Sequence, residues 1–487
     1  MTRLRKITFF IFVIIYLAVV PLVILNALGI VKQKHDTSFQ KTGLIYISTI
    51  PSGAVVYIDK KRFTEKTPTI IRSLDPGIYS IKLLFKNYHP WQKRLVVKKE
   101  IATTAENVFL VPIRWKNHAL SDDSYENLIP IPQYPAILLT KGKFLKDVFS
   151  YQWPEDIRKS VFNMEDLLIS PKIKTLFPET SMYLEEEWEK IDIQEKSSRC
   201  LLIVKGKNQK RYIWSPLNSS ETAEDITKLL SPSSSRLFWS TENHSLLYET
   251  VNKEINLIDL NARAVFPQII KDVTSFDILD GRIYAMHNDN VIKRYNLKGE
   301  FEKNLLSDPQ LIQNLFQNQK SFRLDALTPE IFIFLSAKGT LLSNLLPYII
   351  YESGIKGYLY NERKSRLLIW RENDVGIVNF SKTGLNTLFE YGPSIKWLNL
   401  MGKDITQAYW ANDGSHTIYV DNSQVFITPV EDFNQAEKYL ITPVKRNTSI
   451  TYSDKVGVLF YLDHAHGQLS FIKIRSEIEL LPDNLQP

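Results

Sequence analysis

The C-terminal part of the chain repeats one short pattern, and this repeat restricts the possible folds more than any other feature. Each copy has an aromatic residue, a polar turn, a short apolar strand, a second turn and another strand; the clearest copy spans 409–420 and continues into 424–427. The apolar strands begin at Leu201, Leu246, Ile283, Ile331, Leu367, Thr417 and Leu459, with a mean spacing of 43 residues. Propeller blades of four antiparallel strands recur every ~40–45 residues.

The repeat therefore predicts a mainly β protein that ends in a β-propeller. Each blade buries its faces only against its neighbours, so the copies must close into a ring. We expect this propeller of seven or eight blades at residues 191–480, followed by a tail at 481–487. Residues 113–190 contain six prolines, and Ala136–Leu139 is their clearest strand. The sequence leaves two roles open for this segment, a connecting region or the first blade.

The clearest copy also resembles a known motif. Its matches to the W-S-P-D-G-S phrase of TolB-type and WD40-like propellers are Trp410, Asp413, Gly414 and Ser415. The other copies match this phrase only in part, so the resemblance supports a propeller without a particular subfamily. Aromatic residues of propellers pack between blades, and we expect Trp239, Trp370 and Trp410 in the core.

Residues 43–112 show the alternation and turns of a small β-sandwich. Strands are expected at 44–48, 55–58, 78–85 and 94–98, with turns at 51–54 and 75–77. The Asp-Pro-Gly turn suits proline at one central position and a glycine with positive φ at the next, so Gly77 is expected to have positive φ.

This segment resembles a PEGA domain. The matching residues are Pro51–Ala54, Val56–Asp59, Thr67–Pro68, Pro76–Tyr79, Tyr88 and Trp91. Ser52 stands where the family has glutamate, and Lys60 stands where it usually has glycine. The resemblance implies a small extracytoplasmic β-sandwich of envelope proteins, and it carries over no active-site residue.

Residues 7–31 contain no charged side chain. A helix that rises ~1.5 Å per residue over such a run crosses a bilayer core of about 30 Å. We therefore expect a single transmembrane signal-anchor helix at 7–31, between a stub at 1–6 and a linker at 32–42. A cleaved signal peptide is the alternative, because Ala27-Leu28-Gly29 has the small-residue spacing of a cleavage site.

The flanking charges predict the orientation of this helix. Arg3, Arg5 and Lys6 precede the run, and basic residues favour the cytoplasmic side. The stub is then cytoplasmic, and the bulk of the chain lies in the periplasm, anchored to the inner membrane. In this compartment nucleic acid is not an expected partner.

Charge is concentrated beside the predicted membrane helix. Residues 41–112 hold twelve Lys and Arg against five Asp and Glu, and their net charge of +7 equals that of the whole chain. A basic domain at this place suits anionic headgroups or an anionic wall polymer. An ordinary solvated strand face, with lysines protecting sheet edges, explains the same charges.

The chain contains no sequence motif of a catalytic, cofactor or metal site. No phosphate-binding G-x-x-x-x-G-K-[ST] run and no G-x-S-x-G elbow occurs. His464 and His466 stand in a predicted hairpin turn without a third ligand, and Glu185–Glu187 is expected to be a solvated surface. Cys200 is the single cysteine, so it forms no intramolecular disulfide and is expected to be buried as a small hydrophobe. We therefore predict no site residues and no cofactor.

Two classes of function fit these features. The first is a noncatalytic envelope protein whose propeller is a platform for other envelope proteins or for cell-wall polymer. The second is a propeller enzyme, a hydrolase or lyase that acts on an envelope glycan or ester. Acidic or histidine residues that converge at one end of the central channel would favour the enzyme.

Overall fold

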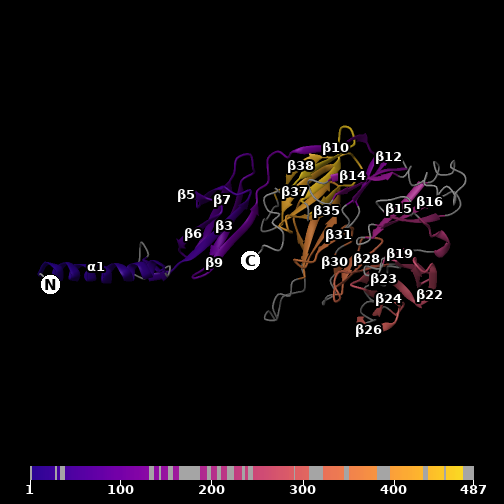
Figure 1. Ribbon diagram of the computed structural model, residues 1–487, viewed down its shortest axis with the longest axis horizontal. Helices are drawn as coiled ribbons and strands as arrows, with labels where there is room; N and C mark the ends of the chain where they lie inside the picture. The colour runs from indigo at the N-terminus through magenta and orange to yellow at the C-terminus, as the bar shows by residue number, and fades with distance from the viewer. Residues whose placement is uncertain are drawn as a thin grey trace. The chain divides into compact units, whose positions relative to one another are not determined.

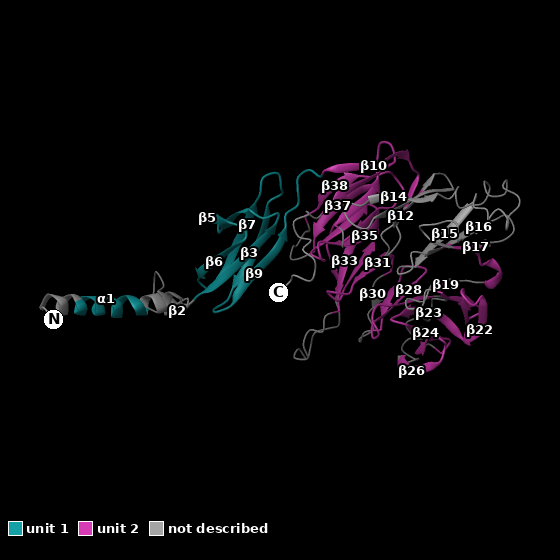
Figure 2. Ribbon diagram, viewed as in Figure 1, with its two compact units in different colours: residues 1–115, 476–487 teal, residues 116–475 magenta. Residues whose placement is uncertain are grey.

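The computed structural model describes residues 3–27, 30–32, 39–130, 136–141, 144–151, 157–163, 187–194, 199–205, 210–216, 224–232, 236–239, 245–289, 291–306, 322–344, 350–351, 353–380, 395–430, 437–454 and 457–474 (Figure 1). The described chain is mainly β, as expected, and contains one α-helix. It divides into two compact units, one of residues 1–115 with 476–487 and one of residues 116–475 (Figure 2).

The helix α1 (Arg3–Ala27) covers most of the uncharged run and ends four residues before the expected boundary at 31. Ile30–Lys32 instead forms strand β1, which pairs antiparallel with β2 (Phe39–Lys41). In the stretch of α1 whose side chains are described, residues 9–21, nine large hydrophobic side chains are exposed. Among the residues that the structure describes, no helix is both long and apolar enough to cross a membrane.

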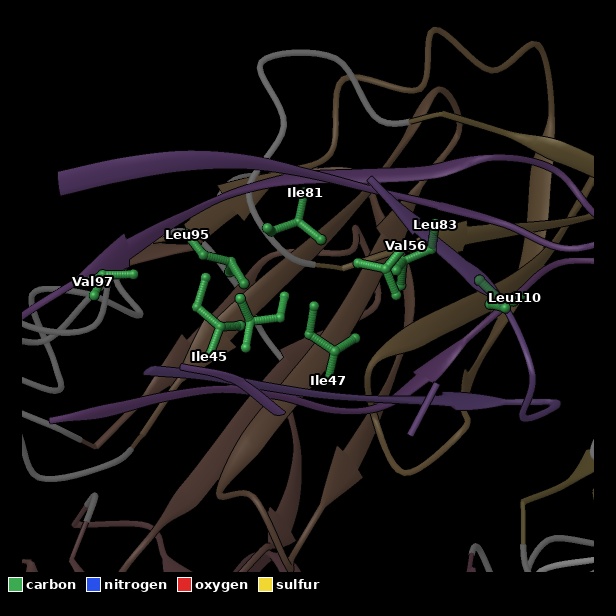
Figure 3. Packing of buried hydrophobic residues seen from close by; sticks show 10 residues of the cluster. Ile45, Ile47, Val56, Ile81, Leu83, Leu95, Val97 and Leu110 are labelled. Atoms are coloured by element: carbon green, nitrogen blue, oxygen red, sulfur yellow. The ribbon is translucent and has the colours of Figure 1, made fainter. Parts of the chain in front are cut away.

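The rest of the first unit is a sandwich of two sheets, in agreement with the sequence. The smaller sheet has the order β6 (Thr69–Leu74), β3 (Gly43–Ile50), β9 (Ala102–Phe109). The larger sheet has the order β5 (Lys61–Lys66), β4 (Val55–Ile58), β7 (Gly77–Leu84), β8 (Trp91–Val97). Figure 3 shows the apolar core between them, which includes Ile45, Ile47, Val56, Ile81, Leu83, Leu95, Val97 and Leu110.

The turns of this sandwich agree with the sequence in one place and differ in another. Gly53 has φ +93° in the turn after Ile50, as a glycine turn allows. The expectation of a positive φ at Gly77 is wrong: Gly77 is the first residue of β7, and the positive φ, 58°, belongs to Ser73. The chain bends at Pro76 between β6 and β7, and there the hydroxyl of Tyr79 donates to the Asp75 carbonyl at 2.8 Å.

The second unit is built from consecutive four-stranded antiparallel sheets, of which the first four are as follows. Sheet one has β11 (Asn127–Pro130), β12 (Ala136–Lys141), β13 (Phe144–Tyr151) and β14 (Ile157–Asn163). Sheet two has β15 (Glu187–Gln194), β16 (Arg199–Lys205), β17 (Lys210–Pro216) and β18 (Glu224–Asp225), followed by the short 3-10 helix η2 (Thr227–Leu229). Sheet three has β19 (Arg236–Trp239), β20 (Leu246–Val251), β21 (Glu254–Asp259) and β22 (Ala264–Ile270). Sheet four has β23 (Val273–Leu279), β24 (Arg282–His287), β25 (Ile292–Asn296) and β26 (Phe301–Leu306).

Four more sheets follow in the same order. Sheet five has β27 (Phe322–Ala326), β28 (Phe332–Ser336), β29 (Leu341–Ser343) and β30 (Ile350–Tyr351). Sheet six has β31 (Ile355–Asn361), β32 (Arg366–Arg371), β33 (Asp374–Asn379) and β34 (Ile395–Trp397). Sheet seven has β35 (Ile405–Ala411), β36 (His416–Asp421), β37 (Gln424–Pro429) and β38 (Tyr439–Pro443). Sheet eight has β39 (Thr451–Ser453), β40 (Val458–Leu462) and β41 (Gln468–Lys473), and its fourth strand is β10 (Asn117–Ser124) from the start of the unit.

The sequence repeat coincides with this architecture. The seven apolar strands that define the repeat are β16, β20, β24, β28, β32, β36 and β40, which are the second strands of sheets two to eight. Within 113–190 the described strands are β10, which belongs to sheet eight, the four strands of sheet one and the start of β15. The described part of the unit therefore has eight sheets of the four-stranded kind that forms propeller blades.

Apolar clusters join the sheets in order. From sheet two to sheet seven, each sheet shares one apolar cluster with the next sheet. Two hydrogen bonds of Ile450, just before β39, join sheets seven and eight. Its carbonyl accepts from the Tyr409 hydroxyl at 2.8 Å, and its N–H donates to the Gln407 side chain at 2.9 Å. A further cluster packs Leu128, Ile137 and Leu139 of sheet one against Val458, Phe460, Leu469 and Phe471 of sheet eight.

Candidate functional site: the linker between sheets six and seven

The segment 398–404, here called the 398–404 linker, joins β34 to β35. Leu398 and Leu400 are buried, whereas the next residue, Met401, is 78% exposed. Asn399 and Met401 have φ of 56° and 50°. A left-handed backbone is uncommon for residues other than glycine, and for methionine it has a conformational cost that the surroundings must offset. The linker is therefore held in this shape by other parts of the fold.

Two buried carboxylates hold the two halves of the linker. Asp374, the first residue of β33, accepts hydrogen bonds from the N–H groups of Asn399 at 3.1 Å and Leu400 at 3.0 Å. Asp421, the last residue of β36, accepts from the N–H groups of Lys403 at 2.8 Å and Asp404 at 2.9 Å. The two acids belong to sheets six and seven and are only 5% and 7% exposed. Buried carboxylates are costly unless they are paired, and these backbone donors offset that cost.

Backbone hydrogen bonds tie the linker to the turn between β32 and β33. The N–H of Gly402 donates to the Asn373 carbonyl at 2.8 Å, and the N–H of Ile405 donates to the Glu372 carbonyl at 2.7 Å. A Cβ at Gly402 would lie 2.8 Å from the Ile405 side chain, so this close approach favours glycine. The linker is thus fixed at its middle and at its end, and Met401 projects from a rigid support.

A tyrosine is buried near both acids. Tyr419 of β36 is fully buried, and within the described residues its hydroxyl has no hydrogen-bond partner. Burial raises the pKa of this phenol, and the charges of Asp421 and Asp374 raise it further. The phenol is therefore neutral at physiological pH and is a poor nucleophile or base.

The first strands of sheets four and five each carry an acid that bonds to the neighbouring sheet. The carboxylate of Asp277 on β23 accepts from the Ala326 N–H on β27 at 2.8 Å. Asp325 on β27 accepts from the Tyr358 hydroxyl of β31 and forms an ion pair with Arg323 at 2.8 Å. Side chains of one sheet thus satisfy polar groups at the free edge of its neighbour. These contacts assign a structural role to both acids.

The histidine pair lies where the sequence predicts it, in the hairpin turn between β40 and β41. Asp463 organises this turn, because its carboxylate accepts from the N–H groups of Ala465, His466 and Gln468 at 2.6 to 2.9 Å. The His466 imidazole is 75% exposed and 3.7 Å from Asp463. Among the described residues, no group of three or more His, Cys, Asp or Glu side chains could hold a metal ion.

The other residues named from sequence are only partly described. Trp410 is buried in the cluster between sheets six and seven, and Trp370 packs partly buried against that cluster, so both are core residues as expected. The side chains of Trp239 and Cys200 lie outside the described part, although their backbones belong to β19 and β16. Of Glu185–Glu187 only the backbone of Glu187, at the start of β15, is described.

Sequence reasoning missed the site at Met401 and the two acids beneath it. Asp421 stands in a segment that the sequence marks as a polar turn, and Asp374 follows a strand in the same way. Such aspartates usually bond to their own turn, and no local signal shows that their partners are in a linker 17 to 26 residues away.

Comparison with known proteins identifies the class of the first domain. Residues 42–110 match the PEGA domain family. This part of the chain is therefore a PEGA domain, as its resemblance implied. No curated protein matches the sequence.

Solved structures similar to the chain are distant from it. PorZ, a surface component of the type-IX secretion system of Porphyromonas gingivalis, is 10% identical to this chain, with a TM-score of 0.37. The match covers 71% of this chain and 42% of PorZ, so this chain spans less than half of PorZ. Hsv2 of Kluyveromyces lactis is 9% identical over 65% of this chain and 97% of Hsv2, with a TM-score of 0.39. The β-propeller domain of Cps50 (Swd1) from Myceliophteria thermophila is 11% identical over 59% of this chain and 96% of that domain, with a TM-score of 0.35. Likenesses this distant carry no argument about function, and the TolB- or WD40-like subtype stays a prediction.

Proposed function

We propose that the chain is a membrane-anchored protein of the cell envelope, with its bulk in the periplasm. In this proposal the second unit is a closed eight-bladed propeller that binds other envelope proteins through the 398–404 linker. Cell-wall polymer is the other partner expected from sequence, but an exposed methionine favours a protein, because apolar anchors fit apolar pockets.

The sequence and the exposure of α1 support the anchor. In the sequence, residues 7–31 are uncharged, and a helix over a run of this length crosses a bilayer core of about 30 Å. Between Phe9 and Val19 the exposed hydrophobic side chains occupy nearly every position, so they surround the helix. Lipid covers such a helix on all sides. The basic residues before the run favour a cytoplasmic N-terminus.

The strand order and the apolar clusters support a closed ring. Sheet eight lacks a fourth strand of its own, and β10 from the start of the unit takes that place. The cluster of sheets one and eight joins the two ends of the series, and β13 of sheet one contacts β15 of sheet two. Each sheet then has two neighbours, which leaves no sheet face uncovered.

The observation that carries the binding role is the exposure of Met401 on a rigid support. Two carboxylates and two backbone hydrogen bonds fix the linker before any partner arrives, so little entropy is lost on binding. Unusual backbone angles held by the fold occur preferentially at functional positions. The carboxylates beneath the linker are occupied by backbone donors, so they support its shape rather than a reaction.

A photocrosslinking amino acid at position 401 tests this proposal in intact membranes. We expect an adduct with a defined envelope protein, identified by mass spectrometry, and membrane fractionation should place the chain in the pellet. The matched control is position 252, because Asn252 is also exposed and has a φ of 49° in a turn of sheet three.

Three results would contradict the proposal. Equal adducts at positions 401 and 252, or none at either, would refute binding through the linker. Recovery of a soluble chain that starts near residue 30 would replace the anchor by a cleaved signal peptide. Turnover of a glycan or ester by the purified chain would favour the enzyme.

A further inference from the structure

One end of the PEGA domain is defined by three chain segments that the strand register brings together. Gly43 at the start of β3 is opposite Leu74 at the end of β6, and Leu44 is opposite Ala102 at the start of β9. Gly77 at the start of β7 is opposite Val97 at the end of β8. The turns 74–77 and 97–102 therefore lie beside the first residues of the domain. We call this the Thr42 end, and the other, where β9 finishes, the Pro112 end.

Exposed apolar side chains gather at the Thr42 end. Ile78 is 67% exposed and stands directly opposite Val96, which is 53% exposed, on the outer face of the larger sheet. Ile101 in the neighbouring turn is 54% exposed. The described PEGA residues 42–110 have one more large hydrophobic side chain that is exposed, Ile70 at 40%. The core of the domain is formed by other residues than Ile78, Val96 and Ile101, so these three side chains do not serve its folding.

Exposed basic side chains surround this apolar group. Arg94 lies two residues before Val96 and thus on the same face of β8, and Lys98 and Lys99 occupy the following turn. Arg72 is exposed near the end of β6. The acids at this end are Asp75, Glu100 and Asp59, whose carboxylate accepts from the N–H of Ser80 opposite Arg94. With the exposed Lys60 next to Asp59, the basic side chains outnumber the acids five to three. Apolar side chains within a basic rim are typical of surfaces that bind anionic membranes.

The chain geometry keeps the Thr42 end close to the last turn of α1. Fifteen residues separate Ala27 from Gly43, but β1 and β2 pair, and Ile30 is directly opposite Lys41. The path from Ala27 to Thr42 is therefore short: three residues along the chain to Ile30, across one strand pair to Lys41, and one residue further. Ala27 and Thr42 are thus separated by at most roughly 20 Å. If α1 ends at the bilayer surface, the Thr42 end is confined next to the headgroups.

We propose that the Thr42 end of the PEGA domain docks onto the anionic bilayer in which α1 is anchored. Ile78, Val96 and Ile101 enter the interface between headgroups and acyl chains, while Arg94, Lys98 and Lys99 contact lipid phosphates. This inference rests on the proposed membrane anchor. It assigns the PEGA domain a positioning role: docking holds the domain at the surface and restricts the reach of the unit that follows it.

Lipid-quenching fluorescence on the full chain in nanodiscs tests the docking. A fluorophore is attached to Ile78→Cys in a Cys200→Ser background, and doxyl-labelled lipids quench it only within the interface. The matched control is Lys86→Cys, an exposed position toward the Pro112 end of the same domain. In discs with phosphatidylglycerol we expect quenching at 78 several-fold stronger than at 86, and a several-fold loss at 78 in discs of phosphatidylcholine alone.

A charge-reversal variant separates docking from mere proximity. Lys98→Glu with Lys99→Glu should reduce quenching at 78 to the level at 86 and leave the melting temperature unchanged, since both side chains are exposed. A chain that elutes apart from the discs refutes the anchor and the docking together. A chain that elutes with the discs but shows equal quenching at 78 and 86, or no effect of lipid charge, refutes the docking alone. Binding of a soluble polyanion that the variant abolishes, without quenching at 78, would assign this surface to a polymer and overturn the docking.

Discussion

Acidification should destabilise the second unit through one buried histidine. His416 begins β36 and is 7% exposed, and its Nδ1 lies 2.9 Å from the Ser415 hydroxyl. Burial lowers the pKa of this imidazole from 6.5 to about 4, because the charged form loses its hydration. In the unfolded chain the same side chain has its ordinary pKa near 6.5. Folding therefore keeps His416 neutral at pH values where the unfolded chain binds a proton.

The direction and size of the effect follow from this difference. The folded pKa is the lower one, so the contribution to stability is fully present above pH 6.5 and is lost as the pH falls toward 4. A difference of about 2.5 units at ~1.36 kcal/mol each gives a loss of about 3 kcal/mol between these pH values. Replacement by glutamine, which does not titrate, should remove this part of the pH dependence.

Urea unfolding of the full chain in detergent, followed by tryptophan fluorescence at several pH values, measures this contribution. The free energy of unfolding of wild type should fall more steeply between pH 6.5 and 4 than that of His416→Gln. His466→Gln is the matched control, because that imidazole is 75% exposed and folding changes its hydration little. Parallel curves for wild type and His416→Gln would refute the reasoning.

Three further substitutions test single features of the structure. Lys60→Gly should stabilise the PEGA domain by about 1 kcal/mol, because Lys60 has φ 73° in the turn between β4 and β5. The control Lys61→Gly, in β5, should lower the melting temperature. A destabilising Lys60→Gly would contradict this account. Tyr419→Phe should leave stability unchanged or raise it by up to ~1 kcal/mol in thermal melts, since it removes a buried hydroxyl without a described partner; a loss above that would reveal a partner. Asp374→Ala should cost about 3 kcal/mol in urea unfolding and weaken crosslinking at 401, because it leaves two linker N–H groups unpaired; unchanged crosslinking would show that the linker keeps its shape without this acid.

The repeat predicted the second strands of seven sheets, because a buried strand with apolar residues on both faces is the most visible part of a blade. Sheet one was harder to see: its second strand at Ala136–Lys141 precedes β16 by far more than the usual spacing, and prolines interrupt the pattern. The exchange of β10 into sheet eight joins residues more than 340 positions apart. Such a pairing depends on ring closure and has no local sequence signal.

In the PEGA domain the family motif identified the sandwich, and single turns were less predictable. Asp-Pro-Gly is compatible with several turns, and the structure places the positive φ at Ser73 rather than at Gly77. The candidate site was not predictable at all. Met401 stands in a segment without a motif, and its support comes from Asp374 and Asp421, whose role depends on the packing of two sheets.

The closed ring is the central claim, and a disulfide between its first and last strands tests it most directly. Ala119 of β10 is directly opposite Ser470 of β41, and cysteines at paired positions of antiparallel strands are close enough to be bridged. In the Cys200→Ser background, Ala119→Cys with Ser470→Cys should form an intramolecular disulfide on mild oxidation, seen as a shift on non-reducing gels. Ala119→Cys with Ser453→Cys should not, because Ser453 is on β39, the opposite edge of the same four-stranded sheet. No disulfide in the first variant, or equal yields in both, would contradict the closure of the ring by β10.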